Sequence, residues 1–186
     1  MRRFAALLVV LVLGLSLAAC GDDSPALDES GADDGADTTT DESADATDTE
    51  EIAMEQGDAG VTVTGELGAK PVITVPGGEP PTTLLYSDLV EGDGAEAPEG
   101  AAVSMHYVGV SWSNGEQFDA SWDNGKTLDY PLSQLIEGWQ RGVPGMKVGG
   151  RRLLVIPPAL GYGSQQVGSI AANETLVFVI DLVALP

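Results

Sequence analysis

The stretch of sequence that decides the fold is LIEGWQRGVPGMKVGGRRLLVIPPALGYG, which runs from Leu135 to Gly163. Its first part carries Ile136, Trp139 and Val143 at helical spacing, which predicts a short helical turn with one apolar face. The Pro144–Gly145 pair ends that turn, because proline lacks a backbone donor and glycine tolerates unusual dihedral angles. The sequence therefore predicts a short helix that presents one large indole ring.

The second part of this stretch predicts a strand followed by a turn. Arg151–Ile156 is rich in leucine and β-branched residues and follows a pair of glycines, so we expect a strand. Pro157–Pro158 cannot continue a central strand, so the chain must leave the sheet there. It then delivers Tyr162 between two glycines, where the phenol can reach over the helix. One indole, one phenol and a sheet beneath them predict a pocket with an aromatic floor.

The N-terminus predicts an export signal and a lipid anchor. Phe4–Leu17 is almost purely apolar and follows a basic start, but it is shorter than the roughly 20 residues that span a bilayer. We interpret residues 1–19 as a signal peptide. The run ends in Leu17–Cys20, followed by Gly21, which resembles a bacterial lipobox in which Cys20 is lipidated; the alternative is an ordinary secretory signal with an incidental cysteine. We expect an exported protein, anchored by lipid to the outer face of the cytoplasmic membrane.

Composition predicts a disordered acidic linker over residues 20–70. Fifteen acidic residues and no basic residue lie between Asp22 and Asp58. Apolar residues are too few to offset the entropy of ordering, and like charges extend such a chain. A solvated stalk is the favoured interpretation, with capture of basic partners or divalent cations as the alternative. The net charge of −21 argues against binding to nucleic acid.

We expect one folded domain over residues 71–186. Residues 61–81 alternate in part like strands, and whether they form an edge strand or lie along the domain stays open at this point. The ranges with strand patterns are Thr82–Leu89, Val103–Val110, Glu116–Ala120, Thr127–Leu132, Arg151–Ile156 and Thr175–Leu185. Several antiparallel strands and one short helix predict an α+β domain, in which an antiparallel sheet wraps the helix to bury Trp139.

The central stretch resembles the FKBP-type peptidyl-prolyl cis/trans isomerases. Their pattern runs Val-Ile-x-Gly-Trp, Met-x-Val-Gly and Tyr-Gly, and here the blocks are Leu135–Trp139, Met146–Gly149 and Tyr162–Gly163 in the same order. The resemblance covers residues 82–186 and implies the FKBP half-barrel and peptidyl-prolyl isomerase activity on Pro-containing polypeptides, without metal or cofactor. It also implies macrolides such as rapamycin or tacrolimus as ligands, and we expect a monomer.

The resemblance also implies the residues of the pocket. Aromatic and aliphatic side chains would form its walls, Trp139 its floor, and Asp119 would hydrogen-bond at the rim. The Ile136 N–H and the Tyr162 hydroxyl would donate to substrate carbonyls. The residues implied as catalytic are Tyr107, Phe118, Asp119, Ile136, Trp139, Tyr162 and Phe178, and those implied to contact the substrate are Leu128, Leu135 and Ile170.

Some residues depart from the family pattern. Leu128 replaces an aromatic residue that often lies at the pocket edge, and Gln166 lies in a loop where some members place a histidine. These departures bear on substrate range and macrolide affinity more than on catalysis. For His106 we expect a hydrogen-bonded structural role rather than metal binding, and for Arg151–Arg152 a solvated pair that flanks a strand.

Two other kinds of function remain as alternatives. An X-Pro bond rotates slowly, with a barrier of about 18–20 kcal/mol, and a pocket that holds the twisted amide better than the planar one would lower it. The same pocket could instead hold Pro-containing segments without turnover, as a binding module or chaperone of the cell envelope. A purely structural lipoprotein would neither bind nor catalyse.

Overall fold

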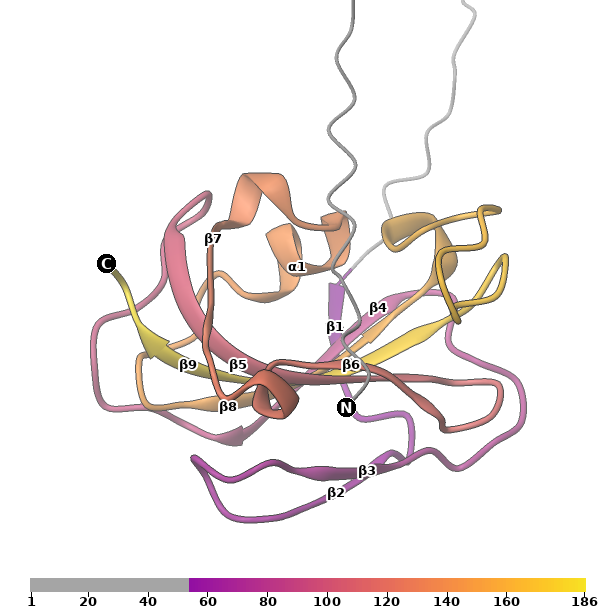
Figure 1. Cartoon of the computed structure of the whole chain (residues 1–186), viewed down its shortest axis with the longest axis horizontal. Coiled ribbons are helices and arrows are strands. Elements are labelled where there is room, and N and C mark those ends of the chain that lie inside the picture. Colours follow the sequence, from indigo (N-terminus) through magenta and orange to yellow (C-terminus); the bar gives the residue numbers. More distant parts are fainter. Residues whose placement is uncertain (1–53) are drawn as a thin grey trace, which may run out of the picture. The chain divides into compact units, whose positions relative to one another are not determined.

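The computed structural model describes residues 54–186 (Figure 1). The predicted signal peptide, the predicted lipidation site Cys20 and the first part of the predicted linker lie outside the described residues. No helix within residues 54–186 combines the length and the apolar character that crossing a membrane requires.

The described residues form a mixed sheet around one α-helix. The strands are β1 (Met54–Gln56), β2 (Thr62–Thr64), β3 (Val72–Thr74), β4 (Leu84–Val90), β5 (Ala102–Ser111), β6 (Gln117–Ala120), β7 (Leu128–Pro131), β8 (Arg151–Ile156) and β9 (Leu176–Ala184). The helices are α1 (Glu137–Gly142) and the short 3-10 turns η1 (Ser121–Asn124), η2 (Leu132–Gln134) and η3 (Pro158–Leu160).

The main sheet has seven strands in the order β1-β4-β8-β9-β5-β6, and β7 also pairs with β5. Every pair in it is antiparallel except β1 with β4, which is parallel. The predicted α+β class and the sheet wrapped around one short helix are therefore confirmed. The sheet also contains one parallel pair, because a short strand that precedes the predicted domain, β1, joins its edge beside β4.

One face of the sheet packs on α1 (Figure 1). Two glycines let the helix lie directly on β8: a Cβ at Gly138 would come within 2.4 Å of the Ile156 side chain, and one at Gly142 within 2.8 Å of Leu154. Trp139 is buried between the helix and the sheet. The alternation of apolar residues along β5 and β9 places Met105, Phe178 and their neighbours on this face.

The opposite face of the sheet packs on the β2–β3 hairpin, which lies on the other side of the sheet from α1 in Figure 1. Val61 and Ile73 of this segment are buried against Val108, Val177 and other residues that point away from the helix. A two-stranded hairpin of this length is marginal by itself, so its packing on the sheet stabilises it. The question left open for residues 61–81 is thus answered by a hairpin and an irregular segment that leads into β4.

The predicted boundary between linker and domain at residue 71 does not match the structure. β1 and β2 lie within the range 20–70 and belong to the folded part. The turn of the hairpin is held by Arg151, which donates to the carbonyls of Gly65 (3.0 Å) and Ala69 (2.8 Å). These contacts join residues more than eighty positions apart, so local composition could not reveal them.

The expectation of a solvated arginine pair is also wrong. Arg151 and Arg152 are 2% and 5% exposed. Their side chains point to opposite faces of β8, as neighbours on a strand must, and both faces are covered. Arg151 pairs with Asp181 on the hairpin side, and Arg152 pairs with Asp88 on the helix side.

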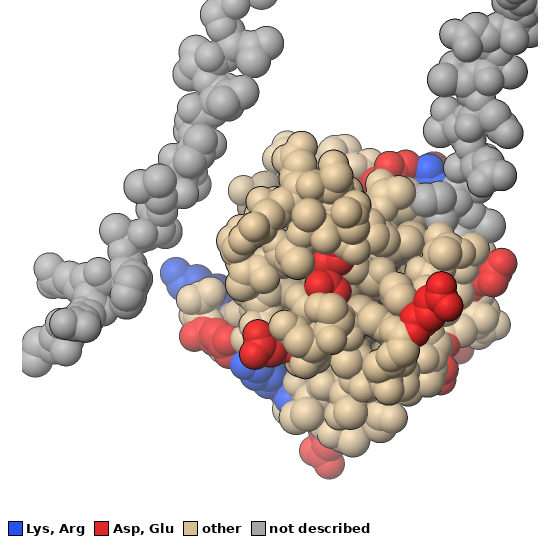
Figure 2. Space-filling model, turned by 90° about the vertical axis from the view of Figure 1, so that its right-hand side faces the viewer, with Lys and Arg blue, Asp and Glu red and all other residues tan. Residues whose placement is uncertain are grey.

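The described part of the chain is acidic in its own right. It holds sixteen acidic and six basic side chains, and five of those basic side chains form ion pairs with carboxylates. Figure 2 shows one face of the molecule, on which uncharged surface dominates and acidic side chains are scattered. The charge of the folded part therefore gives no basic surface for nucleic acid.

Candidate active site

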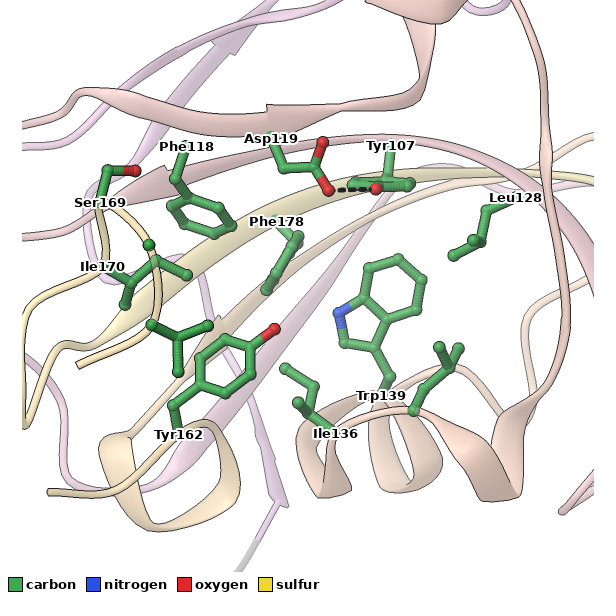
Figure 3. A pocket seen from close by; sticks show the side chains of 13 residues that line it. Tyr107, Phe118, Asp119, Leu128, Ile136, Trp139, Tyr162, Ser169, Ile170 and Phe178 are labelled. Atoms are coloured by element: carbon green, nitrogen blue, oxygen red, sulfur yellow. Dashed lines mark hydrogen bonds between the residues drawn. The ribbon is translucent and has the colours of Figure 1, made fainter. Parts of the chain in front are cut away.

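A cavity of about 360 Å³ opens between the sheet, the start of α1 and the loop after η3 (Figure 3). Its lining is mostly apolar, with a few polar groups. The lining residues are Tyr107, Phe118, Asp119, Leu128, Leu135, Ile136, Trp139, Tyr162, Val167, Gly168, Ser169, Ile170 and Phe178. The structure thus brings together all of the residues that the sequence implied for the pocket.

Aromatic rings meet edge to face at the base of the cavity. The ring of Trp139 lies 5.3 Å from Tyr107 at 81° and 5.1 Å from Phe178 at 89°. Phe118 packs against Phe178 at 5.4 Å and 82°. Such contacts are favoured by the ring quadrupoles and fix the rings relative to one another. The Trp139 indole N–H is closed off from solvent and has no hydrogen-bond partner among the described residues, so the floor offers a ring and not a donor.

A glycine makes this arrangement of rings possible. Gly109 lies on β5 opposite Phe178 of β9. A Cβ at this position would lie 2.6 Å from the Phe118 ring and 2.7 Å from the Phe178 ring. The missing side chain of Gly109 therefore provides the space in which the two walls of the cavity pack. The sequence contained this glycine in its His-Tyr-Val-Gly motif, but only the structure shows what it does.

Two phenols, one carboxylate and the Ser169 hydroxyl are the polar side chains that line the cavity (Figure 3). The Tyr107 hydroxyl donates a hydrogen bond to the carboxylate of Asp119. Burial, together with that hydrogen bond and the charge of Asp119, raises the pKa of Tyr107 well above its ordinary value. Burial and the charge of Asp119 also raise the pKa of Tyr162. Both phenols therefore remain protonated, and able to donate, at neutral pH.

The start of α1 presents a backbone donor at the cavity. Ile136 precedes the helix in an extended conformation, and its carbonyl accepts from Trp139 N (2.9 Å) and Gln140 N (3.2 Å). Its own N–H has no acceptor among the described residues. Ile136 itself lines the cavity. An unsatisfied N–H before the first helical turn is a ready donor for a carbonyl oxygen.

Sequence reasoning missed three lining residues, Val167, Gly168 and Ser169. They form a tight turn that is closed by reciprocal hydrogen bonds between Val167 and Ile170, at 3.0 and 2.9 Å. Gly168 has a φ of +58°, which favours glycine. The Val-Gly-Ser-Ile pattern could have indicated this turn, but only Ile170 was included. Gln166 of the same loop does not line the cavity.

The remaining polar residues have structural contacts. His106 lies 3.0 Å from the hydroxyl of Ser121 and stacks on Trp122 with ring centres 4.7 Å apart. It therefore has the hydrogen-bonded environment that the sequence led us to expect. Within residues 54–186, no group of three or more His, Cys, Asp and Glu side chains is placed to hold a metal ion.

Comparison with known proteins agrees with the fold and the cavity. The family described as FKBP-type peptidyl-prolyl cis-trans isomerase matches residues 94–183. A probable FK506-binding protein of Corynebacterium glutamicum is 53% identical over 115 residues, which is 62% of this chain and 98% of the relative. An FK506-binding protein of Streptomyces anulatus is 55% identical over 120 residues, covering 62% of this chain and 97% of the relative.

A solved structure extends the comparison to three dimensions. The crystal structure of FkpA from Escherichia coli has a TM-score of 0.53 and 36% sequence identity, over 56% of this chain and 48% of that chain. Together with the sequence matches, this defines the protein as a peptidyl-prolyl cis-trans isomerase. The chain belongs to the FKBP-type family of these enzymes.

Proposed function

We propose that the aromatic cavity is the site at which this enzyme binds the proline ring of an X-Pro segment and accelerates rotation about the preceding amide bond. One observation carries the proposal: a buried indole floor and aromatic walls lie beside protein donors that have no partner among the described residues. An apolar cavity with a few placed polar groups is the usual form of a small-ligand site.

The proposed mechanism needs no nucleophile, because only a bond rotation is catalysed. Amide resonance makes the planar form charge-separated, so an apolar cavity stabilises that form less than water does and favours the twisted one. The Ile136 N–H and the Tyr162 hydroxyl donate to carbonyls on either side of the twisting bond. They thereby hold the flanking chain while the ring rests on Trp139. Binding that favours the twisted amide over the planar ground state lowers the barrier.

Asp119 has a supporting role in this proposal. Its carboxylate accepts the hydrogen bond from Tyr107 and so fixes the orientation of that wall. It also places a negative charge at the rim, where the polarised amide of the substrate would lie. Leu128, Leu135 and Ile170 complete the apolar contacts around the proline and the residue before it.

The proposed substrates are Pro-containing segments of exported proteins. The proposal of export and lipid anchoring depends on the signal-like residues 1–19 and on Cys20, the only cysteine of the chain. Its test is fractionation of cells that produce the full chain. We expect the wild-type protein in the membrane fraction and Cys20→Ser in the soluble exported fraction; equal distribution of the two proteins would contradict the lipid anchor.

We propose macrolide binding at the same cavity. Two relatives that match almost over their whole length are described as FK506-binding proteins. The proposal is tested by competition between FK506, which is tacrolimus, and a prolyl peptide. If the cavity is the site, FK506 inhibits isomerisation competitively, and Phe118→Ala lowers the affinity for both FK506 and the prolyl peptide.

The central test is a protease-coupled prolyl isomerisation assay. The wild-type chain is compared with a double variant, Phe118→Ala with Trp139→Phe, which removes one wall and reduces the floor. We expect the wild type to accelerate isomerisation and the double variant to lose most of that activity while it remains folded. Full activity in the double variant would place the reaction elsewhere, and peptide binding without acceleration by the wild type would favour the binding module.

A further inference from the structure

The helix that carries the cavity floor is held at its end by a buried arginine. Arg152 on β8 donates from Nη1 to the carbonyl oxygens of Gly142 (2.8 Å) and Pro144 (3.1 Å). Gly142 is the last residue of α1, and Pro144 follows it in the chain. The last carbonyls of a helix have no partner within the helix, and here a guanidinium satisfies them.

The guanidinium is itself fixed from two other sides. Its Nε and Nη2 donate to the two carboxylate oxygens of Asp88 on β4, at 2.7 and 2.9 Å. Its central carbon lies 4.9 Å above the ring of Tyr86, also on β4. Bidentate pairing and stacking on an aromatic ring orient a planar guanidinium more strictly than a single contact does. The end of α1 is therefore tied through Arg152 to the neighbouring strand.

Trp139 lies one turn before this anchored end. Its carbonyl accepts the hydrogen bond of Val143 N at 3.0 Å, so the floor residue and the anchored turn belong to the same short helix. The helix has only six residues, and glycines 138 and 142 face β8 with no side chain that could lock its position. A contact that fixes the helix end therefore also sets where the indole lies against Tyr107 and Phe178.

We infer that Arg152, oriented by Asp88, is a positioning residue for catalysis: it fixes the depth and tilt of the Trp139 floor without touching the substrate. This inference depends on the proposed site. It assigns to an ion pair outside the cavity, in which Arg152 is buried and Asp88 is partly exposed, an effect on turnover and not only on stability.

Arg151 offers a matched control on the same strand. It is 2% exposed, and like Arg152 it donates to both oxygens of one carboxylate, that of Asp181 at 2.5 and 2.8 Å. It also donates to two backbone carbonyls, those of Gly65 and Ala69. The two arginines thus make the same kinds of hydrogen bonds, but Arg151 holds the hairpin and Arg152 holds the helix. Arg151→Met and Arg152→Met each remove a bidentate ion pair and two bonds to backbone carbonyls, from opposite faces of the sheet, and Arg152→Met also removes the contact with the Tyr86 ring.

The experiment compares the two variants in the full chain, at a temperature below the midpoint of thermal unfolding of each variant. We measure kcat/KM for a prolyl peptide and the indole N–H resonances of the tryptophans by NMR. For Arg152→Met we expect kcat/KM to fall by about 10- to 100-fold and the Trp139 resonance to shift. For Arg151→Met we expect kcat/KM within about twofold of the wild type and an unchanged Trp139 resonance, although its stability also falls.

Opposite results would overturn the inference. If both variants keep the Trp139 resonance and the wild-type kcat/KM, Arg152 is structural only. If Arg152→Met does not fold, Asp88→Asn decides: a shifted Trp139 resonance with lower kcat/KM supports the inference, and unchanged values contradict it. The Trp139 resonance can be measured without any turnover. If the wild-type protein binds no prolyl peptide, the proposed site is contradicted. A shifted Trp139 resonance in Arg152→Met would then still show that Arg152 positions the helix.

Discussion

The hydroxyl of Tyr107 donates a hydrogen bond to the carboxylate of Asp119, which joins the middle of β5 to β6 at the rim of the cavity. The bond holds a wall residue and a charged rim residue in one orientation. Its removal tests whether the rim must be fixed for activity.

Tyr107→Phe keeps the ring and removes the bond. We expect kcat/KM to fall by a factor of about 5, which corresponds to about 1 kcal/mol, the usual net value of one hydrogen bond. The measurement is the protease-coupled assay, with Tyr130→Phe as the control, because Tyr130 is exposed and does not line the cavity. Equal activity of the Tyr107 variant and the wild type would show that the bond is dispensable.

Gly109→Ala tests the space between the aromatic walls. The new methyl group would meet the Phe118 and Phe178 rings at less than 3 Å, so at least one ring must move. We expect a loss of about 1–3 kcal/mol in the free energy of unfolding and a loss of prolyl-peptide affinity of tenfold or more, because overpacking shifts neighbouring side chains.

The control for that substitution is Gly57→Ala. A Cβ at Gly57 meets only the Leu85 side chain, at 3.7 Å, which is an ordinary contact. We expect this variant to keep its peptide affinity. If the two glycine variants bind the peptide equally well, the walls do not need the space at Gly109.

Trp139 is expected to serve both the fold and the proposed site. It is 4% exposed, and its replacement by alanine leaves a cavity in the core that contains Leu154 and Ile156. We expect Trp139→Ala to lower the free energy of unfolding by about 3–5 kcal/mol. Denaturant titration measures this loss. Trp139→Phe should lower the free energy of unfolding by less than Trp139→Ala does. A loss of peptide affinity in this folded variant can then be attributed to the cavity floor.

The pKa values of the two phenols at the cavity predict the response to alkaline pH. Both are raised in the folded protein, so ionisation favours the unfolded chain. Their contribution to stability is fully present below about pH 10, the ordinary tyrosine pKa, and is lost as the pH rises from there through the raised folded values. We expect the double variant Tyr107→Phe with Tyr162→Phe to lose less stability than the wild type between about pH 9.5 and 11, as measured by denaturant titration.

The position of the domain boundary can be tested by truncation. A fragment that begins at residue 54 keeps β1, the hairpin and the bonds from Arg151 to residues 65 and 69. A fragment that begins at residue 71 loses all of them and uncovers Val177 and Val179. We expect the shorter fragment to be less stable by several kcal/mol and more prone to association, as seen by denaturation and light scattering. Equal stability would mean that the hairpin contributes nothing to the fold.

The sequence was most informative where periodicity and local signals agree. The strand patterns of Val103–Val110 and Thr175–Leu185 predicted β5 and β9, and the spacing of Ile136, Trp139 and Val143 predicted α1. The cavity residues came from the family resemblance, since no local pattern states that Phe118 and Tyr162 meet across the fold. Each of these residues depends on a different element for its position.

The sequence was least informative where long-range contacts decide. The acidic residues around β1 and β2 made this segment resemble a linker, yet Arg151 and the apolar back of the sheet hold it in place. Contacts with distant segments, the hairpin for Arg151 and the end of α1 for Arg152, also explain why two adjacent arginines are buried. The charge of the two arginines predicted that they face solvent. Their carboxylate partners, Asp181 and Asp88, lie on other strands and could not be identified from the local sequence.

The parallel strand β1 lies against the first half of β4, where Met54 pairs with Leu84 and Gln56 with Tyr86. An uncovered strand edge is a template on which another polypeptide can add its own strand. A molecule approaching this margin meets a three-residue strand that soon turns away toward the hairpin, and so finds little backbone to extend. Among the described residues, this border of the sheet therefore offers an incoming chain only a short length of backbone with which to pair.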